Sequence, residues 1–252
     1  MQTRLALITG ATSGIGLATA QAFAQQKIDL IICGRNKEKL RELQQTLATE
    51  VRVIALCFDV SKNDEVVAAI NTLPIDFKQI NILVNNAGNA HGLSLIQDGN
   101  VQDWDLMIDI NVKGLLYVSR AIMPIMVANK VGHIVNISSV AGKQTYQNGA
   151  VYCASKKAVE AISEGMRLDL TQHGIKITNI APGAVETNFS LVRFKGDTAK
   201  ASNVYKGYQP IQPQDVADAI VYAINAPANV TIADMMLYAA AQAAPTVIYK
   251  KD

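Results

Sequence analysis

The chain has 252 residues, of which 50% are apolar and 17% are charged, and this composition excludes a disordered or low-complexity protein. Its 23 basic and 21 acidic residues leave a net charge of only +2, so the charge favours neither nucleic acid nor a membrane surface as a partner. A chain of this length can bury a large core, and we expect one α/β domain that spans residues 1–252.

The cysteines and histidines argue against a metal centre. The three cysteines, Cys33, Cys57 and Cys153, lie far apart without metal-ligand spacing, which predicts reduced thiols, a cytoplasmic location and no bound metal. The N-terminus opens directly into an apolar stretch, and no uninterrupted run of about 18 apolar residues follows. We therefore expect neither a targeting segment nor a membrane span.

Strand-like and helix-like patterns alternate along the first half of the chain. Short apolar runs predict buried strands, and apolar residues at helical spacing predict the helices between them. Ser61 is the expected N-cap of the third helix. The strands are predicted at residues 4–9, 28–33 and 51–58, and the helices at 17–27, 37–47 and 61–73.

The second half continues the alternation. Further strands are predicted at 80–84, 133–137, 176–180 and 232–237, and helices at 101–129, 151–173 and 213–225. Residues 184–209 lose periodicity, as a mobile segment that covers a substrate would. This order predicts a doubly wound parallel sheet of about seven strands with helices on both faces.

A glycine-rich turn follows the first strand and opens the first helix. Gly10, Gly14 and Gly16 allow a sharp backbone turn that approaches a pyrophosphate, while the helix N-terminus offers unpaired N–H donors. A tight strand-to-helix turn needs glycine even without a ligand. The position of this glycine-rich turn at the first strand–helix junction nevertheless favours a dinucleotide site.

The end of the second strand indicates which dinucleotide is bound. A carboxylate there would select NAD through the ribose hydroxyls, but the sequence has Gly34-Arg35-Asn36. A guanidinium suits a 2′-phosphate, so we expect NADP(H), the alternative being that Arg35 is a solvated loop charge. Asp59 would accept a hydrogen bond from the adenine amino group, or would only cap its turn.

Three groups between residues 139 and 156 form a candidate catalytic set. Tyr152 and Lys156 are four residues apart in a helical pattern, so their side chains share one helix face. A phenol is a poor base at neutral pH, and a neighbouring ammonium lowers its pKa towards the working range. Ser139 would hydrogen-bond the oxygen that Tyr152 protonates.

These residues resemble the short-chain dehydrogenase/reductase family over nearly the whole chain. The motifs that carry the resemblance occur in the family's order, and the step of 13 residues from Ser139 to Tyr152 (152 − 139) agrees with it. They are Thr9 to Gly16, Asn85-Asn86-Ala87-Gly88, Asn111, Ile137-Ser138-Ser139, Tyr152-Cys153-Ala154-Ser155-Lys156 and Pro182-Gly183. The resemblance implies a Rossmann-like fold and an oxidoreductase that transfers hydride between NADP(H) and a secondary alcohol or its carbonyl.

The resemblance also implies roles for individual residues. Tyr152 would be the general acid/base, Ser139 would orient the carbonyl, and Lys156 would bind the nicotinamide ribose and lower the Tyr152 pKa. Asn111 would hold a water that links Lys156 to solvent; otherwise it marks a helix irregularity or a buried amide. The expected cofactor-binding set is Gly10, Thr12, Ser13, Gly14, Ile15, Gly16, Arg35, Asn36, Asp59, Val60, Asn86, Ala87, Gly88, Tyr152, Lys156, Pro182, Gly183, Val185 and Thr187.

A narrower resemblance concerns the substrate. Residues 192–197, 234–236 and 104–107 are similar to the NADP-dependent 3-hydroxy acid dehydrogenases, which act on serine, L-allo-threonine and related compounds. A substrate carboxylate would be held by Arg193 or Lys195, unless both are surface charges. The tail after Leu237 departs from this pattern. Ser139, Tyr152 and Arg193 are thus the expected substrate-binding residues.

Two other functions remain open at this point. One is a reductase of the same family that acts on another carbonyl class, such as a 3-oxoacyl carrier thioester, a steroid or a small ketone. The other is a dinucleotide sensor that has lost its chemistry, against which the intact catalytic set argues. The helices at 101–129 and 151–173 are apolar on more than one side, which suggests a homo-oligomer, and the resemblance implies a tetramer.

Overall fold

Seven parallel strands form the central sheet, in the order β3-β2-β1-β4-β5-β6-β7. The computed structural model describes residues 4–251, so residues 1–3 and 252 of the predicted domain lie outside it. The doubly wound sheet predicted from the alternating pattern is confirmed. Its strands are β1 (Leu5–Thr9), β2 (Asp29–Gly34), β3 (Val53–Cys57), β4 (Ile82–Asn85), β5 (Gly132–Ile137), β6 (Ile175–Pro182) and β7 (Asp234–Leu237).

The central strands are apolar on both faces because helices cover both faces. Every residue of β1, β4 and β5 is buried, as in strands that have no solvent-facing side. The strand order reverses between β1 and β4, since the chain winds outward from β1 to β3 and then returns to the other side. Such a reversal opens a crevice at the carboxyl ends of the two strands, which is where ligands bind in sheets of this kind.

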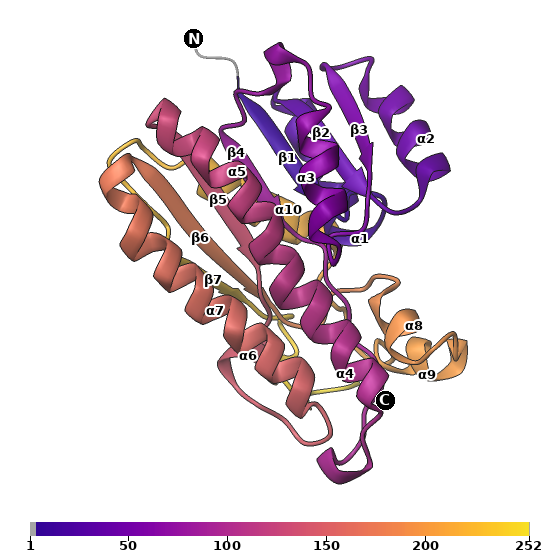
Figure 1. Cartoon of the computed structure of the whole chain (residues 1–252). Coiled ribbons are helices and arrows are strands. Elements are labelled where there is room, and N and C mark those ends of the chain that lie inside the picture. Colours follow the sequence, from indigo (N-terminus) through magenta and orange to yellow (C-terminus); the bar gives the residue numbers. More distant parts are fainter. Residues whose placement is uncertain (1–3, 252) are drawn as a thin grey trace.

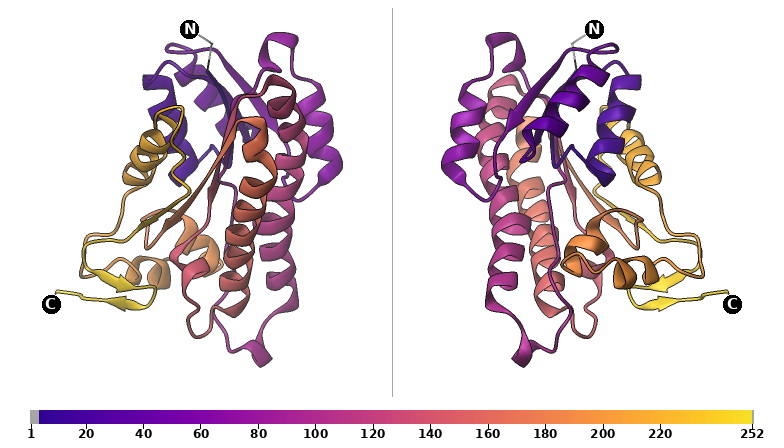
Figure 2. Two further views of the ribbon diagram at one scale, coloured as in Figure 1. Left: turned by 90° about the vertical axis from the view of Figure 1, so that its left-hand side faces the viewer. Right: turned by 90° about the vertical axis from the view of Figure 1, so that its right-hand side faces the viewer.

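Two layers of helices enclose the sheet (Figures 1 and 2). On one face, α3 (Asn63–Asn71), α5 (Leu115–Asn129) and α7 (Ala150–Leu170) bury side chains such as Val66, Ile122 and Val159. On the other face, α1 (Gly14–Gln25), α2 (Lys37–Leu47) and α10 (Pro213–Ile224) bury side chains such as Phe23, Leu40 and Ile220. Each layer supplies a separate apolar core.

The long helix predicted at 101–129 is interrupted. It consists of α4 (Val101–Ile108), a π-helical turn (Asp109–Gly114) and α5, so the predicted helical region is confirmed and one turn of it is irregular. By length and composition alone this run could cross a membrane, with a mean hydropathy of 1.3. In the fold 44% of that apolar window is buried, and side chains such as Val118 and Ile122 pack against the sheet.

Two further expectations need correction. Ser61 does not cap α3: the N-cap is Lys62, and the Ser61 backbone N–H and hydroxyl both donate to Asp59 Oδ1, at 2.9 and 2.8 Å. The segment 184–209 is not wholly irregular, because it contains the short helices α8 (Phe189–Arg193) and α9 (Thr198–Asn203). Helices of five or six residues are too short to show periodicity in a sequence. Further short elements are α6 (Val140–Lys143) and 3₁₀ turns at Ile75–Phe77, Ile96–Asp98 and Thr171–His173.

The C-terminal tail forms a hairpin that was not expected. Strands β8 (Gln242–Ala244) and β9 (Val247–Ile248) pair antiparallel, and Figure 2 shows this yellow hairpin beside the orange helices α8 and α9. The Lys251 N–H donates to Gly207 O at 2.7 Å. The buried Gln242 side chain accepts a hydrogen bond from the Ala184 N–H at 2.9 Å. The tail therefore supports both ends of the segment 184–209.

Candidate active site

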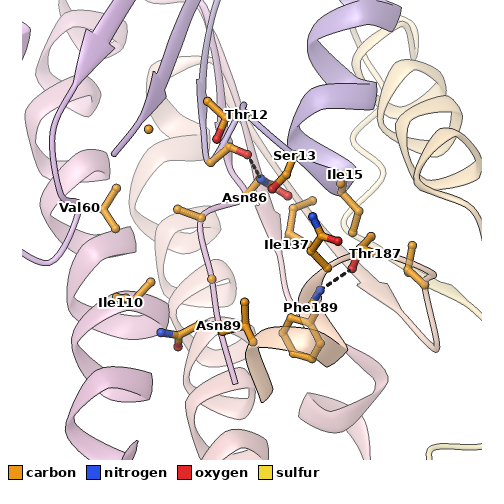
Figure 3. Close-up of a pocket in the computed structure, with 18 of the residues that line it drawn as sticks. Thr12, Ser13, Ile15, Val60, Asn86, Asn89, Ile110, Ile137, Thr187 and Phe189 are labelled. Atoms are coloured by element: carbon orange, nitrogen blue, oxygen red, sulfur yellow. Dashed lines mark hydrogen bonds between the residues drawn. The ribbon is translucent and has the colours of Figure 1, made fainter. Parts of the chain in front are cut away.

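A cavity of about 400 Å³ opens at the carboxyl ends of β1, β4, β5 and β6. Figure 3 shows Thr12, Ser13 and Ile15 at one end and Asn89 and Phe189 at the other. All the predicted cofactor-binding residues line this cavity except Gly16. Residues that are far apart in the sequence thus meet at one crevice, which is the crevice that the strand order creates.

The glycine turn has the backbone geometry that its sequence predicts. Gly10 and Gly14 have φ angles of +66° and +52°, in the left-handed region that favours glycine. Gly16 packs inward, because an added Cβ would lie 2.3 Å from Gly10 O and 2.5 Å from Asn86 Nδ2. The Ser13 side chain makes no capping bond to α1, so it leaves the helix's first N–H groups to another partner. This cradle fits a dinucleotide pyrophosphate.

Asn86 holds the turn in place from the end of β4. Its Nδ2 donates to Thr9 O at 2.9 Å and to Gly10 O at 3.2 Å. In return, Thr9 Oγ1 accepts from the backbone N–H groups of Asn86 and Ala87, both at 3.0 Å. The contact between Asn86 and the turn is visible in Figure 3. Asn86 is therefore part of the cradle's support as well as of the cavity wall.

Arg35 and Asp59 lie together at the adenosine end of the cavity. The Arg35 side chain is 69% exposed, and its Nη1 lies 3.8 Å from Asp59 Oδ2. The other Asp59 oxygen accepts the two bonds from Ser61 and so closes its own turn. Arg35 is free to rotate towards a ligand phosphate, and the structural role foreseen for Asp59 is present.

Ser139, Tyr152 and Lys156 converge on the wall of the cavity. Ser139 follows β5 by two residues and is the N-cap of α6, where its Oγ accepts from the Ala141 N–H at 3.1 Å. Tyr152 and Lys156 follow each other by one turn of α7, and both are buried. Lys156 Nζ donates to Ile137 O at 3.0 Å. The Ser139 hydroxyl donates to Pro182 O at 3.3 Å.

Burial acts on these two ionisable groups in opposite directions. It raises the pKa of the Tyr152 phenol to about 12, and the positive charge of Arg193 is the strongest influence that opposes it. It lowers the pKa of the Lys156 ammonium to about 8, with the Glu160 carboxylate opposing. Arg193 is therefore a further cation beside Tyr152, in addition to Lys156, which the sequence indicates for that role.

Asn111 lies behind the cavity rather than on its wall. Its side chain is held by Asn89, with Oδ1 accepting from the Asn89 N–H and Nδ2 donating to Asn89 O, both at 2.8 Å. Nδ2 also donates to Ser155 Oγ at 3.0 Å. Asn111 is part of the π-helical turn, so the helix irregularity considered above is present. A Cβ on Gly88 would lie 3.1 Å from Asn111 Oδ1 and 3.3 Å from Lys156 Nζ, so both reach the same glycine.

The two cations proposed for the substrate carboxylate differ in their surroundings. Lys195 Nζ lies 2.9 Å from Asp103 Oδ2 and is already paired. Arg193 reaches the active-site tyrosine: its guanidinium carbon is 4.7 Å from the Tyr152 ring centroid and 5.1 Å from that of Phe189. One guanidinium nitrogen, Nη2, donates to the Tyr146 hydroxyl at 3.0 Å. Its Nε is buried without a hydrogen-bond partner.

Several lining residues escaped the sequence analysis. Phe189 and Tyr146 lie in or beside segments without periodicity, so nothing in the sequence marks them. Ile110 carries only the general signal of an apolar helix position. The wall also includes Gly34, Phe58, Asn89, Ile137, Ser138, Asn188 and Val192. Among residues 4–251, no group of three or more His, Cys, Asp or Glu side chains is placed to hold a metal ion.

Comparison with known proteins places this geometry in context. Residues 4–196 match the family model described as "short chain dehydrogenase". A relative from Schizosaccharomyces pombe, named "NADP-dependent 3-hydroxy acid dehydrogenase", is 39% identical over 97% of this chain and 96% of that protein. A relative from Chromohalobacter salexigens, named "Sulfoacetaldehyde reductase 2", is 42% identical over 90% of this chain and 91% of that protein. A solved structure described as "The Closed form of serine dehydrogenase complexed with NADP+" matches with a TM-score of 0.92 at 38% identity, covering 98% of this chain and all of that one.

Proposed function

The chain belongs to the short-chain dehydrogenase family, and from this premise we propose that it is an NADP-dependent oxidoreductase acting on 3-hydroxy acids. The reaction interconverts an alcohol and its carbonyl compound, with substrates such as serine or L-allo-threonine. The observation that carries the proposal is the meeting of Ser139, Tyr152 and Lys156 on the wall of a cavity whose far end is the glycine turn. Relatives whose names include NADP and 3-hydroxy acids support the cofactor and the substrate class.

The cofactor half of the cavity fits NADP(H). When bound, its nicotinamide supplies or accepts the hydride. The N-terminus of α1 would hold the pyrophosphate, and Arg35 would pair with the 2′-phosphate. Pro182, Gly183, Val185 and Thr187 would flank the nicotinamide, and Lys156 would hold its ribose. These roles are proposals that rest on the position of each residue along the cavity.

Tyr152 would carry the proton. In the reducing direction its phenol donates a proton to the substrate oxygen, and a phenol with its pKa near 12 holds that proton at neutral pH. In the oxidising direction the phenolate takes the proton back, which requires the pKa to be lowered by nearby positive charge. Ser139 would orient the same oxygen by a hydrogen bond. We propose that Asn111 positions the Asn89 backbone and, through a water, connects Lys156 to solvent.

Arg193 is the proposed anchor for the acidic group of the substrate. Its position on the Tyr152 ring places a cation beside the reacting carbon, and its Nε lacks a partner in the protein. A 3-oxo acid and sulfoacetaldehyde, the compounds that the relatives' names indicate, both carry an anionic group separated from the carbonyl carbon by one carbon. One guanidinium can therefore serve either anion, so a sulfonated aldehyde is the second candidate substrate.

The remaining parts of the proposal concern assembly and cover. We propose that residues 184–209 close over the substrate and that the chain forms a homotetramer. Leu106, Leu116 and Leu168 on α4, α5 and α7 are 44%, 40% and 75% exposed, and these apolar side chains support an interface on that layer. Cys33, Cys57 and Cys153 are free thiols, which supports a cytoplasmic location.

Replacing the proton donor tests the reaction directly. The Tyr152→Phe variant should lose at least about 10³-fold in kcat, because it removes the proton that balances hydride transfer. NADPH oxidation with 3-oxo acids and sulfoacetaldehyde is followed by absorbance, and NADPH affinity is measured by fluorescence. The affinity should stay within about threefold, and an exposed tyrosine on α10 supplies the control variant Tyr222→Phe. Normal turnover by Tyr152→Phe would overturn the assignment.

A further inference from the structure

The Arg193 guanidinium lies against two aromatic rings beside the reacting groups. It is 4.7 Å from the Tyr152 centroid and 5.1 Å from the Phe189 centroid, and Tyr146 fixes one of its nitrogens. This arrangement places a full positive charge over the ring that would carry the negative charge of a phenolate. A cation that lies over an aromatic ring, in a site with little water, interacts strongly with that ring.

Among the charged groups near Tyr152, Arg193 is the one whose guanidinium lies over the ring, where a bound substrate anion could reach it. Lys156, one helical turn away, donates to Ile137 O, and Lys195 is paired with Asp103 from α4. His91 lines a second, smaller cavity with Tyr152, and burial lowers the pKa of the imidazole, so it is neutral at pH 7. The remaining neighbours are uncharged at that pH: Ser139, Tyr146 and Cys153 near the phenol, and Trp104 and Met107 from α4.

We propose that Arg193 couples substrate charge to acid–base strength: its guanidinium stabilises the Tyr152 phenolate, and an anionic substrate that pairs with it weakens this stabilisation. The inference rests on the proposed function, in which Tyr152 is the acid/base and Arg193 the anion anchor. It goes further, because the same side chain then performs both tasks at once. Substrate binding would itself make Tyr152 a weaker acid.

The physical basis is competition for one charge. Burial raises the Tyr152 pKa, and Arg193 is the first of the influences that lower it. A carboxylate or sulfonate bound to the guanidinium offsets that positive charge, so the phenolate loses part of its stabilisation. A neutral alcohol of the same size leaves the guanidinium unpaired. The effect therefore depends on substrate charge and not on occupancy of the cavity.

Oxidation of an alcohol requires the phenolate, so its rate rises with pH through the Tyr152 pKa. The pH dependence of kcat/KM gives the Tyr152 pKa in the enzyme before the substrate binds. The pH dependence of kcat gives the Tyr152 pKa in the complex with substrate. With a 3-hydroxy acid, the apparent pKa of the kcat profile should be about one unit higher than that of the kcat/KM profile. With the corresponding methyl ester, which carries no acid group, the two profiles should agree to within about 0.3 units.

Two substitutions of Arg193 separate charge from shape. Arg193→Met keeps a long side chain without the charge. In this variant the apparent pKa of the kcat/KM profile should rise by about one unit. The apparent pKa values of the kcat and kcat/KM profiles should then agree for the 3-hydroxy acid and for its ester. KM for the 3-hydroxy acid should rise at least about tenfold, while KM for its ester stays within about twofold. Arg193→Lys keeps the charge and should move the profile by less than half as much. The matched control is Lys200→Met, an exposed cation on α9 in the same segment, which should leave every profile in place.

A second measurement does not depend on turnover. The ultraviolet absorbance of tyrosinate is titrated in the protein without substrate, and Tyr152→Phe is subtracted to isolate the Tyr152 signal. Its pKa should be about one unit higher in Arg193→Met and in the parent protein saturated with a non-reacting dicarboxylate. Tyr146→Phe, which frees the guanidinium without removing it, should give a smaller shift in the same direction.

The outcomes distinguish this inference from the proposed function. If Tyr152→Phe is inactive but Arg193→Met changes neither the profiles nor the tyrosinate titration, the coupling is wrong and the reaction stands. If Arg193→Met raises KM for acids without shifting any pKa, Arg193 only binds substrate, and the inference is again overturned. If Tyr152→Phe turns over normally, the proposed function itself fails.

Discussion

Tyr152 and Lys156 lie one helical turn apart, and burial drives both towards their neutral forms. It raises the pKa of the phenol to about 12 and lowers that of the ammonium to about 8. At neutral pH the phenol therefore keeps its proton, while the ammonium loses its proton more readily than that of a free lysine. The same burial has a thermodynamic cost, because Lys156 must be kept dry where its charge is poorly solvated.

Replacing Lys156 by an apolar side chain should therefore stabilise the protein. Below about pH 8 both the folded and the unfolded state carry the Lys156 proton, and the folded state bears the full cost of the buried charge. Between about pH 8 and the ordinary lysine pKa of 10.5, the unfolded state binds more protons, so the stability of the parent protein rises with pH. We expect Lys156→Met to gain about 1–3 kcal/mol in free energy of unfolding at pH 7 and much less at pH 10. Denaturant titrations at the two pH values measure this, and a gain that does not shrink at high pH would contradict it.

Arg35 should decide which dinucleotide is preferred. It lies at the adenosine end of the cavity, largely exposed and 3.8 Å from Asp59. Arg35→Asp should weaken NADPH by about 10–100-fold and leave NADH within about threefold, because a carboxylate repels the 2′-phosphate. Binding of both dinucleotides is measured by fluorescence. Arg41→Asp, an exposed position on α2, is the matched control and should leave the ratio of the two affinities unchanged. An unchanged ratio in Arg35→Asp would remove Arg35 from the site.

At the scale of elements, α1 is held unusually close to the ends of β1 and β4. The approach is possible because Gly16 has no side chain: a Cβ there would lie 2.3 Å from Gly10 O. The Asn86 amide fills the remaining space and bonds two carbonyls of the turn. The position of the helix N-terminus, and with it the phosphate cradle, depends on this contact.

Two glycine substitutions test that dependence. Gly16→Ala should destabilise the fold by about 2–4 kcal/mol and weaken NADPH binding at least tenfold, because backbone and not a flexible side chain must move. Gly165→Ala in α7 is the control: an added Cβ there meets nothing within 4 Å, so helix propensity should make it neutral or stabilising by up to about 1 kcal/mol. Thermal unfolding with and without NADPH reads both effects. Equal behaviour of the two variants would show that close packing at Gly16 is unimportant.

Long elements were predictable from the sequence because their apolar patterns are strong. The strands of the sheet and helices such as α2 and α10 begin and end near their expected residues, helped by punctuation such as Pro213 and Gly174. The π-helical turn in 101–129 was foreseen only as an alternative interpretation of Asn111, since one extra residue per turn barely disturbs a broadly apolar helix. Helices α8 and α9 and the hairpin β8–β9 are too short to show periodicity, and long-range contacts hold them in place.

The candidate site shows the same division. The glycine turn and the pair Tyr152 and Lys156 carry local spacing, which a sequence displays directly. The stacking of Arg193 on Tyr152 joins α8 to α7 through two residues that are 41 positions apart (193 − 152), and no local pattern records that contact. A sequence also does not show which group a polar side chain will hydrogen-bond. Ser61 was the expected N-cap of α3, but its hydroxyl donates to Asp59 instead.

At the scale of the whole molecule, the helical layer of α4, α5 and α7 presents apolar side chains to solvent. Figure 1 shows these three helices on one side of the sheet. Leu168 is 75% exposed near the end of α7, and Leu116 is 40% exposed on α5. Isolated exposed leucines are common, but several on adjacent helices of one layer form the kind of surface that a second copy covers. The proposed tetramer rests on this layer.

A charged residue on that layer should disrupt the assembly. Leu168→Asp places a carboxylate in the proposed interface and should shift the sedimentation coefficient to that of a smaller species at micromolar concentration. Tyr222→Asp on α10, an equally exposed position on the opposite face of the sheet, should leave it unchanged. A parent protein that sediments as a monomer would contradict the tetramer regardless of the variants.

The C-terminal hairpin belongs to a part of the chain that holds no residue of the dinucleotide cradle. The match to the family model ends at residue 196, within the segment 184–209 that we propose closes over the substrate, and the glycine turn, Arg35, Tyr152 and Arg193 all lie before it. The groups that brace this segment, Gly207, Gln242 and Lys251, all lie after it. A protein engineer therefore has a crossover point near residue 197: recombining the downstream piece between relatives changes how the lid is anchored while the dinucleotide cradle stays intact.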